Sequence, residues 1–161
     1  MAVIVRDAKL GDAWELIELI FEFKQHLIKL GAKTINRNPQ VLKSGVALEV
    51  GSTFRNDNWK YIVAEREGTL IGFLIGQIER CAPTDEYESC LRIMGDYLTS
   101  KSMGNARILQ KMWDRLISWG VKKGVGYTFG MIHPGNQPAI KVAKAVNFKH
   151  HMTQFLRLEG D

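Results

Sequence analysis

Three titratable side chains lie in apolar, strand-like surroundings where they could transfer protons. Glu88 and Asp96 belong to the segment ESCLRIMGDYLT, and His133 ends the segment VGYTFGMIH. A carboxylate or an imidazole held near a reacting nitrogen can act as a general base. A strand carboxylate is more often a surface residue, and His133 precedes Pro-Gly and could equally belong to an exposed turn. These residues are therefore catalytic candidates, each with a plain structural alternative.

Asn136 stands between a strand-like and a helix-like segment. It opens the stretch NQPAIKVAKAVNF, which has apolar residues at helical spacing and two lysines, Lys141 and Lys144. Asparagine is a good helix N-cap because its side-chain oxygen accepts a backbone N–H of the first turn. The same amide could contact a ligand at the end of the preceding strand. The two roles do not exclude one another.

Positive charge is concentrated in the second half of the chain. Residues 1–80 carry 11 Lys and Arg against 10 Asp and Glu, whereas residues 101–157 carry ten basic residues and one acidic residue, Asp114. Such a segment produces a positive field that favours a polyanionic partner. Lysines on helix surfaces also serve solubility, so a single lysine indicates little.

Length and composition predict one domain spanning residues 1–161, with 45% hydrophobic and 24% charged residues. Its two cysteines, Cys81 and Cys90, are too few for a disulfide framework and are expected to be reduced thiols. The opening MAVIVRDAKLGD lacks the apolar core of a signal peptide, and GTLIGFLIGQI is too short to span a bilayer. We therefore expect a soluble, cytoplasmic protein without membrane contact.

The hydrophobic pattern predicts the element order β-α-α-β-β-β-α-β-α-β. Residues 3–8 form a strand, and residues 12–30 form a helix with Asp12 as N-cap and Gly31 as its stop. A second helix begins at Asn38 and Pro39 and runs to about Phe54. The remaining elements are a hairpin (59–65 and 70–80), a strand with a bulge at Gly95 (88–99), a helix ended by Gly124, a strand (125–133), a helix (136–145) and a last strand (148–160).

This order resembles the GNAT superfamily of acyl-CoA-dependent N-acetyltransferases over essentially the whole chain. VIVRDAKLGDAWELIELI is similar to the family's first strand and helix, and WKYIVAEREGTLIGFLIGQIE to its central hairpin. The resemblance implies an α/β (α+β) fold, in which a mixed, mostly antiparallel sheet has a splayed pair of parallel strands and helices on both faces. In the family's closing signature, Ala143 replaces a tyrosine and Asn147 a glycine, and the positions that match are Asn136, Ala139, Val142 and Phe148.

The resemblance implies acetyl-CoA as a co-substrate. In the family, pantetheine fits between the splayed strands, here 88–99 and 125–133, and the pyrophosphate meets small residues at a helix start. KSMGNA (101–106) has the form of that loop, while the spacing from the following helix favours GNARIL (104–109), so its register stays open. Arg107 could pair with a phosphate or be a solvated member of a basic stripe. The implied contacts are Leu98, Thr99, Met103, Gly104, Asn105, Ala106, Arg107 and Asn136.

In the family, a neutral amine attacks the thioester, and the base implied here is Asp96, Glu88 or His133. The family's acid is missing because its tyrosine position holds Ala143. The acceptor is an amine of a small molecule or a protein, and the acidic stretch TDEYE (84–88), near the expected pocket mouth, suits a cationic one. No metal is expected, because no third ligand accompanies the histidine pair at 150–151.

Two functions are consistent with the sequence. One is an N-acetyltransferase that transfers an acetyl group from acetyl-CoA to a primary amine. The other is a non-catalytic GNAT-fold protein whose basic segment binds protein or nucleic acid; Ala143 and the irregular phosphate loop favour it. A nucleic-acid site would place aromatic residues among basic ones on one exposed face, and the sequence indicates no such face. A homodimer is compatible with either function.

Overall fold

A computed structural model describes residues 2–99 and 106–150. Its strands form one sheet in the order β1-β2-β3-β4-β5, in which only the β4–β5 pair is parallel. The predicted mixed sheet with one parallel pair is confirmed. The elements are β1 (Ile4–Asp7), η1 (Leu10–Asp12), α1 (Ala13–Lys29), α2 (Pro39–Thr53), β2 (Trp59–Arg66), β3 (Thr69–Arg80), β4 (Ser89–Leu98), α3 (Ala106–Lys122), β5 (Tyr127–Gly130) and α4 (Gln137–Ala145).

The predicted strand at 148–160 falls largely outside the described residues, and residues 148–150 are not in a strand. The strand predicted at 125–133 is shorter, because only Tyr127–Gly130 pairs with β4. Both cysteines are free thiols.

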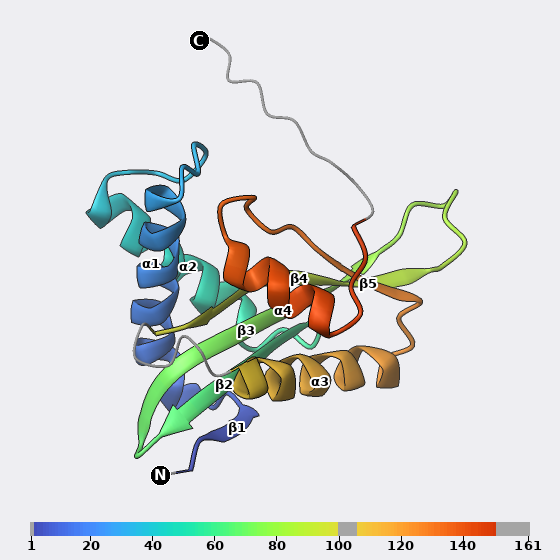
Figure 1. Cartoon of the computed structure of the whole chain (residues 1–161), viewed down its shortest axis with the longest axis horizontal. Coiled ribbons are helices and arrows are strands. Elements are labelled where there is room, and N and C mark those ends of the chain that lie inside the picture. The colour runs from blue at the N-terminus through green and yellow to red at the C-terminus, as the bar shows by residue number, and fades with distance from the viewer. Residues whose placement is uncertain (1, 100–105, 151–161) are drawn as a thin grey trace, which may run out of the picture.

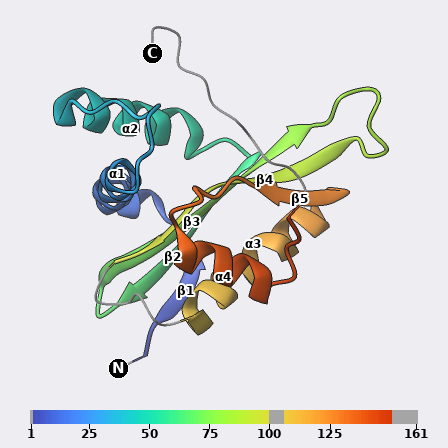
Figure 2. The ribbon, with the colours of Figure 1, turned by 45° about the horizontal axis from the view of Figure 1, so that its top comes forward.

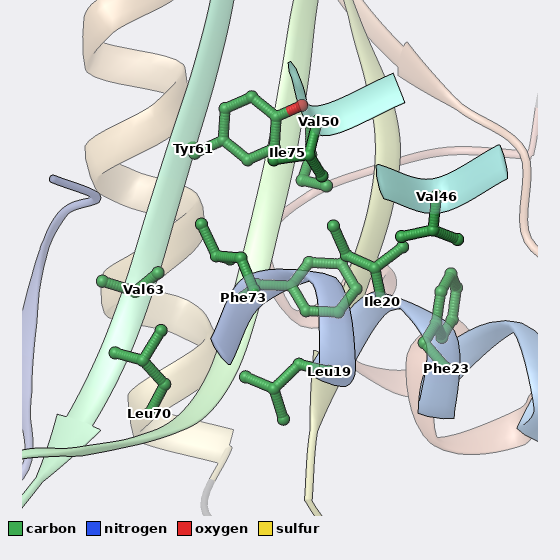
Figure 3. Packing of buried hydrophobic residues seen from close by; sticks show 11 residues of the cluster. Leu19, Ile20, Phe23, Val46, Val50, Tyr61, Val63, Leu70, Phe73 and Ile75 are labelled. Carbon is green, nitrogen blue, oxygen red and sulfur yellow. The ribbon is translucent and has the colours of Figure 1, made fainter. Parts of the chain in front are cut away.

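Helices cover both faces of the sheet, with α1 and α2 on one side and α3 and α4 on the other (Figures 1 and 2). Each face buries its own apolar cluster. On the α3 side, Met112 and Leu116 pack against Leu74 and Leu91. On the other side, Phe73 of β3 lies among residues from α1 and α2 (Figure 3), which include Leu19, Ile20, Phe23, Val46 and Val50.

The helix ends follow local sequence rules with one exception. Asn38 caps α2 through its side-chain oxygen, which accepts the N–H groups of Gln40 and Val41. Gly31 and Gly124 end α1 and α3 with φ of 99° and 81°, values that favour glycine.

The exception is Asp12, which has the predicted N-cap position but not the side-chain hydrogen bond of a cap. Its carboxylate instead accepts two hydrogen bonds from the Arg6 guanidinium, at 2.7 and 3.0 Å, and one from the Lys9 N–H at 2.6 Å. Arg6 also contacts Glu65 of β2. Asp12 therefore ties η1 to β1 and, through Arg6, to the sheet.

This network predicts acid-sensitive stability. The hydrogen bonds from Arg6 lower the pKa of Asp12, so the carboxylate stabilises the fold above its unfolded pKa of about 3.9, and that contribution is lost as pH falls through the folded pKa. We expect Asp12→Asn to lower the free energy of unfolding by about 1–3 kcal/mol at pH 7 and by much less near pH 3. Urea unfolding at both pH values measures this, with the exposed Asp57→Asn as control. An equal loss at both pH values would contradict the ion-pair explanation.

β4 contains a bulge that changes which residues face each helical layer. Met94 and Gly95 lie where the β3–β4 register shifts, so β4 has one extra residue there. Before the bulge, Ile93 faces α3; after it, Asp96 faces α3 and Tyr97 faces α1. The bulge predicted at Gly95 is confirmed, and it decides which candidate side chains lie on each face.

Candidate active site

β4 and β5 pair only over part of β4. Their ladder joins Cys90–Ile93 to Tyr127–Gly130, and β4 then continues to Leu98 without a β5 partner. The Thr99 N–H donates to the Ile71 carbonyl of β3 at 2.9 Å. Because backbone groups alternate along a strand, the N–H groups of Asp96 and Leu98 point to the opposite edge, where β5 has ended. This half of β4, residues 94–98, is called the free edge below.

The free edge offers backbone donors and acceptors to an extended ligand. A buried peptide-like group needs hydrogen-bond partners, and an extended chain lying along a strand edge finds them at every second residue. Among the predicted contacts, Leu98 has a buried side chain, so it can contribute only backbone groups at this edge. The Thr99 N–H is already used by β3.

Asp96 lies on the free edge and faces the α3 layer. Burial of its carboxyl group raises its pKa, although the nearby Trp113 indole N–H and its own backbone N–H favour the charged form. Trp113 is 2% exposed, and its Nε1 has no hydrogen bond of ordinary geometry within the described residues. The Asp96 carboxyl therefore holds a proton to higher pH than an ordinary aspartate.

Tyr97 lies on the opposite face and meets α1. Its hydroxyl donates a 2.8 Å hydrogen bond to Oε1 of Glu22, and its ring centroid lies 6.2 Å from that of His26. Burial and the Glu22 carboxylate raise the pKa of the Tyr97 hydroxyl above its ordinary value, so this group remains a donor. Adjacent residues of β4 thus present acidic groups to two different faces.

The start of α3 is partly described. Met103, Gly104 and Asn105 lie outside the described residues, while α3 begins at Ala106. Arg107 is exposed in the first turn and has no partner among the described residues, which leaves its guanidinium available to an anion. A helix N-terminus with a first-turn arginine favours phosphate through backbone N–H groups and the helix dipole.

Asn136 caps α4. Its side-chain oxygen accepts the Ala139 N–H at 3.4 Å, and its own N–H donates to the His133 carbonyl at 2.8 Å. The capping role is therefore present. The long capping bond occupies only the side-chain oxygen, so the amide NH₂ remains available to a ligand.

The departures from the closing signature have local explanations. Asn147 has φ of 66°, in the left-handed region where asparagine is tolerated better than most residues, and it ends α4 in place of glycine. Phe148 then packs edge-on against Trp113, with ring centroids 5.0 Å apart. Ala143 is buried and presents no proton donor. Only this last change removes a chemical group.

The other two catalytic candidates lie apart. Glu88 is exposed just before β4, eight residues from Asp96, or roughly 25 Å of extended chain. The acidic stretch 84–88 lies with it at the paired end of β4, away from the free edge. His133 lies in the turn before α4, where its Nδ1 accepts the Gly135 N–H at 3.1 Å. His133 lies in the same turn as Asn136, whose N–H donates to the His133 carbonyl.

Two shallow hollows lie over the opposite edge of the sheet. Both are lined by Asp7, Lys60 and Trp119, and neither includes a candidate residue. Asp7 bridges Lys60 and Arg115 there, each at 2.6 Å. These hollows are separate from the free edge.

Glu22, His26 and Tyr97 form a group that no sequence motif indicated. Glu22 and His26 are one helical turn apart, which is a signal visible in the sequence. Glu22 and Tyr97 are 75 positions apart in the sequence, and the bulge in β4 is what turns Tyr97 toward α1.

No protein-family model matches the sequence, and no curated protein matches it. Solved structures do match the fold. A predicted acetyltransferase from Clostridium acetobutylicum, solved with acetyl-CoA, has a TM-score of 0.76 and 19% identity over 98% of this chain and 96% of that one. The aminoglycoside N-acetyltransferase AAC(6')-Iy, bound to the bisubstrate analogue CoA-S-monomethyl-acetylneamine, has a TM-score of 0.74 and 16% identity over 99% of both chains.

A ribosomal-protein-alanine N-acetyltransferase from Brucella melitensis biovar Abortus 2308 has a TM-score of 0.69 and 14% identity, with 99% of this chain and 100% of that chain covered. The likeness therefore spans the whole chain, and at these identities it shows the GNAT fold. In the part of the chain that the structure describes, no helix is long and apolar enough to cross a membrane.

Proposed function

We propose that this chain, which has the fold of the GNAT acetyltransferases, transfers an acetyl group from acetyl-CoA to a primary amine. The observation that carries the proposal is the free edge of β4, where the N–H groups of Asp96 and Leu98 have no strand partner within residues 2–99 and 106–150. Solved proteins of this fold carry acetyl-CoA or a CoA analogue.

The described residues fit such a co-substrate. The free edge would hold its amide-containing arm, and Arg107 with the start of α3 would hold phosphate. Asn136 would offer its side-chain NH₂ from the turn before α4. The predicted contacts at 103–105 lie outside the described residues and keep their place in the proposal. When bound, acetyl-CoA supplies a thioester, whose carbonyl carbon gains a bond to the amine nitrogen while the carbon–sulfur bond breaks.

We assign the two proton transfers of the reaction to opposite faces of β4. The amine must lose its proton before it attacks, and the departing sulfur must gain one. Asp96 faces α3, the side from which the phosphate-binding helix holds the co-substrate, and burial raises the pKa of its carboxyl. We assign to Asp96 the protonation of the sulfur, in place of the tyrosine that Ala143 replaces. The proton of the amine leaves on the α1 side, where water accepts it.

Calorimetric titration with acetyl-CoA, CoA and 3′-dephospho-CoA tests the proposal. Micromolar binding that weakens for dephospho-CoA and at higher salt would support it, because the exposed basic residues near the α3 start would contribute phosphate contacts. Absence of heat and of any competition at millimolar acetyl-CoA would refute it.

A paired substitution separates the two roles of Asn136. Asn136→Asp keeps a capping oxygen but loses the NH₂ donor, whereas Asn136→Ala loses both. We expect both variants to weaken CoA binding about 5–20-fold, as for loss of one ligand hydrogen bond, and only the alanine variant to lose about 1 kcal/mol of stability. Calorimetry and thermal unfolding measure the two effects. Wild-type affinity in the aspartate variant would leave Asn136 as a cap alone.

A second function is favoured by a specific observation. Ala143 offers no acid, and α3 and α4 carry exposed basic side chains that would attract a macromolecular anion, including Arg107, Lys111, Lys141 and Lys144. A non-catalytic protein of this kind would bind duplex or single-stranded nucleic acid or an acidic protein, with affinity that falls steeply with salt. Such binding, together with no response to acetyl-CoA, would favour this alternative.

A further inference from the structure

One face of α1 runs alongside the free edge of β4 and reaches the turn that follows β5. Glu22, His26 and Leu30 are spaced by one turn each, so they lie on one side of the helix and its end. Tyr97 of the free edge contacts the first two of these residues. At the other end, a Cβ atom built on Gly135 would lie 3.4 Å from the Leu30 carbonyl, so the 133–136 turn lies against the end of α1.

Within this group, the Glu22 carboxylate has one oxygen that can bind a cation. Tyr97 fixes Oε1 of Glu22 at 2.8 Å, and Oε2 has no partner among the described residues. Glu22 is exposed, so a ligand can reach it from solvent. The other acidic residues of α1 are engaged elsewhere: Glu15 accepts the Leu70 N–H at 2.9 Å, and Glu18 pairs with Lys43 at 2.5 Å. Glu22 is thus the α1 carboxylate aimed at the free edge.

We propose that Glu22, positioned by Tyr97, binds the ammonium group of the acceptor, and that the acceptor is an aliphatic amine, which carries a proton at neutral pH, rather than an arylamine. The assignment of this cation as the acceptor rests on the proposed function. The Tyr97 hydroxyl keeps its proton and orients the carboxylate, which makes it a positioning residue. An ammonium held at Glu22 lies on the α1 face, opposite Asp96, and so approaches the free edge from the side away from α3.

Direct binding tests the inference without turnover. The full-length protein, with and without saturating CoA, is titrated with cyclohexylammonium or with aniline at pH 7.5, and backbone amide NMR shifts report the dissociation constants. The two probes share ring size but differ in charge. We expect cyclohexylammonium to shift amides of α1 and β4, Glu22→Gln to weaken it at least 10-fold, and Tyr97→Phe to weaken it several-fold. Glu18→Gln should change nothing, and aniline should bind no better to wild type than to Glu22→Gln.

The outcomes separate the two proposals. Equal affinity of wild type and Glu22→Gln for cyclohexylammonium, or no binding by wild type, would overturn the subsite, whatever CoA does. Ammonium binding that depends on Glu22 in a protein without CoA affinity would keep the cation subsite and refute the acetyltransferase. If CoA binds and the enzyme turns over cyclohexylamine, Glu22→Gln and Tyr97→Phe should raise KM for the amine and leave the CoA dissociation constant unchanged.

Discussion

Asp96→Asn is expected to make the protein more stable and much less active. Burial raises the pKa of Asp96, so the folded state either retains a proton on this carboxyl or buries a charge as the pH rises. The favourable contribution of the neutral carboxyl is complete below the unfolded pKa of about 3.9 and is lost as pH rises toward the folded pKa. Asparagine removes that cost, so Tm at pH 7 should rise while Tm near pH 3 should stay close to wild type.

Activity should move in the opposite direction. If Asp96 protonates the leaving sulfur, its loss should reduce kcat about 100-fold or more, since proton transfer by a positioned side chain contributes about 10²–10⁴-fold. Release of CoA thiol measures kcat, and calorimetry checks that the CoA dissociation constant is retained. The exposed Asp114→Asn on α3 is the matched control and should change neither quantity. A gain of stability without loss of kcat, or a comparable loss in Glu88→Gln alone, would contradict the assignment.

Gly72→Val is expected to cause a larger loss of stability than any other substitution proposed above. A Cβ atom at Gly72 would lie 2.3 Å from Leu98 Cδ2 and 2.6 Å from the Tyr97 carbonyl oxygen. The second of these atoms belongs to backbone and cannot rotate away, so β4 must move at its free edge. We expect a loss of about 3 kcal/mol or more in the free energy of unfolding, with weaker CoA binding in whatever protein remains folded.

Gly45→Ala is the matched control for this experiment. Gly45 lies exposed in α2, and a Cβ atom there meets no heavy atom within 4 Å. Alanine in a helix interior should stabilise the protein by about 0.5–1 kcal/mol and leave CoA binding unchanged. Urea unfolding of both variants measures the difference. A Gly72→Val protein as stable as wild type would show that β4 can shift freely, which is incompatible with a preformed free edge.

Local sequence signals predicted most of the fold. Asn38, Gly31 and Gly124 marked helix ends because capping depends on residues within one turn of the helix. Gly95 marked the bulge because glycine in a strand is costly unless the backbone needs it. The prediction for Asp12 failed because a competing side chain, not a distant one, decides its hydrogen bonds. Asp12 has the residue type and position of a cap, yet its carboxylate accepts hydrogen bonds from the Arg6 guanidinium instead of from the first turn of α1.

The site was less predictable. Asp96 was identified as a candidate, but its orientation toward Trp113 follows from the bulge and its raised pKa from burial, and both require the packed structure. The Glu22–Tyr97 contact joins α1 to β4, and neither residue belongs to a motif. The role of Asn136 as a cofactor contact is still a prediction.

The bulge at Met94 and Gly95 also limits how this gene can change. Gaining one codon between Gly95 and Asp96 would add a residue to the regular part of β4 and turn every later side chain of that strand over, so Asp96 would point at α1 and Tyr97 at α3. Such an insertion would exchange the faces of Asp96 and Tyr97 although the rest of the protein sequence stays the same. The loop at 81–88 can gain or lose codons without this effect, because it lies outside the β3–β4 pairing that sets the faces of β4. Length variation among descendants of this chain should therefore accumulate at the hairpin tip and be absent from the second half of β4.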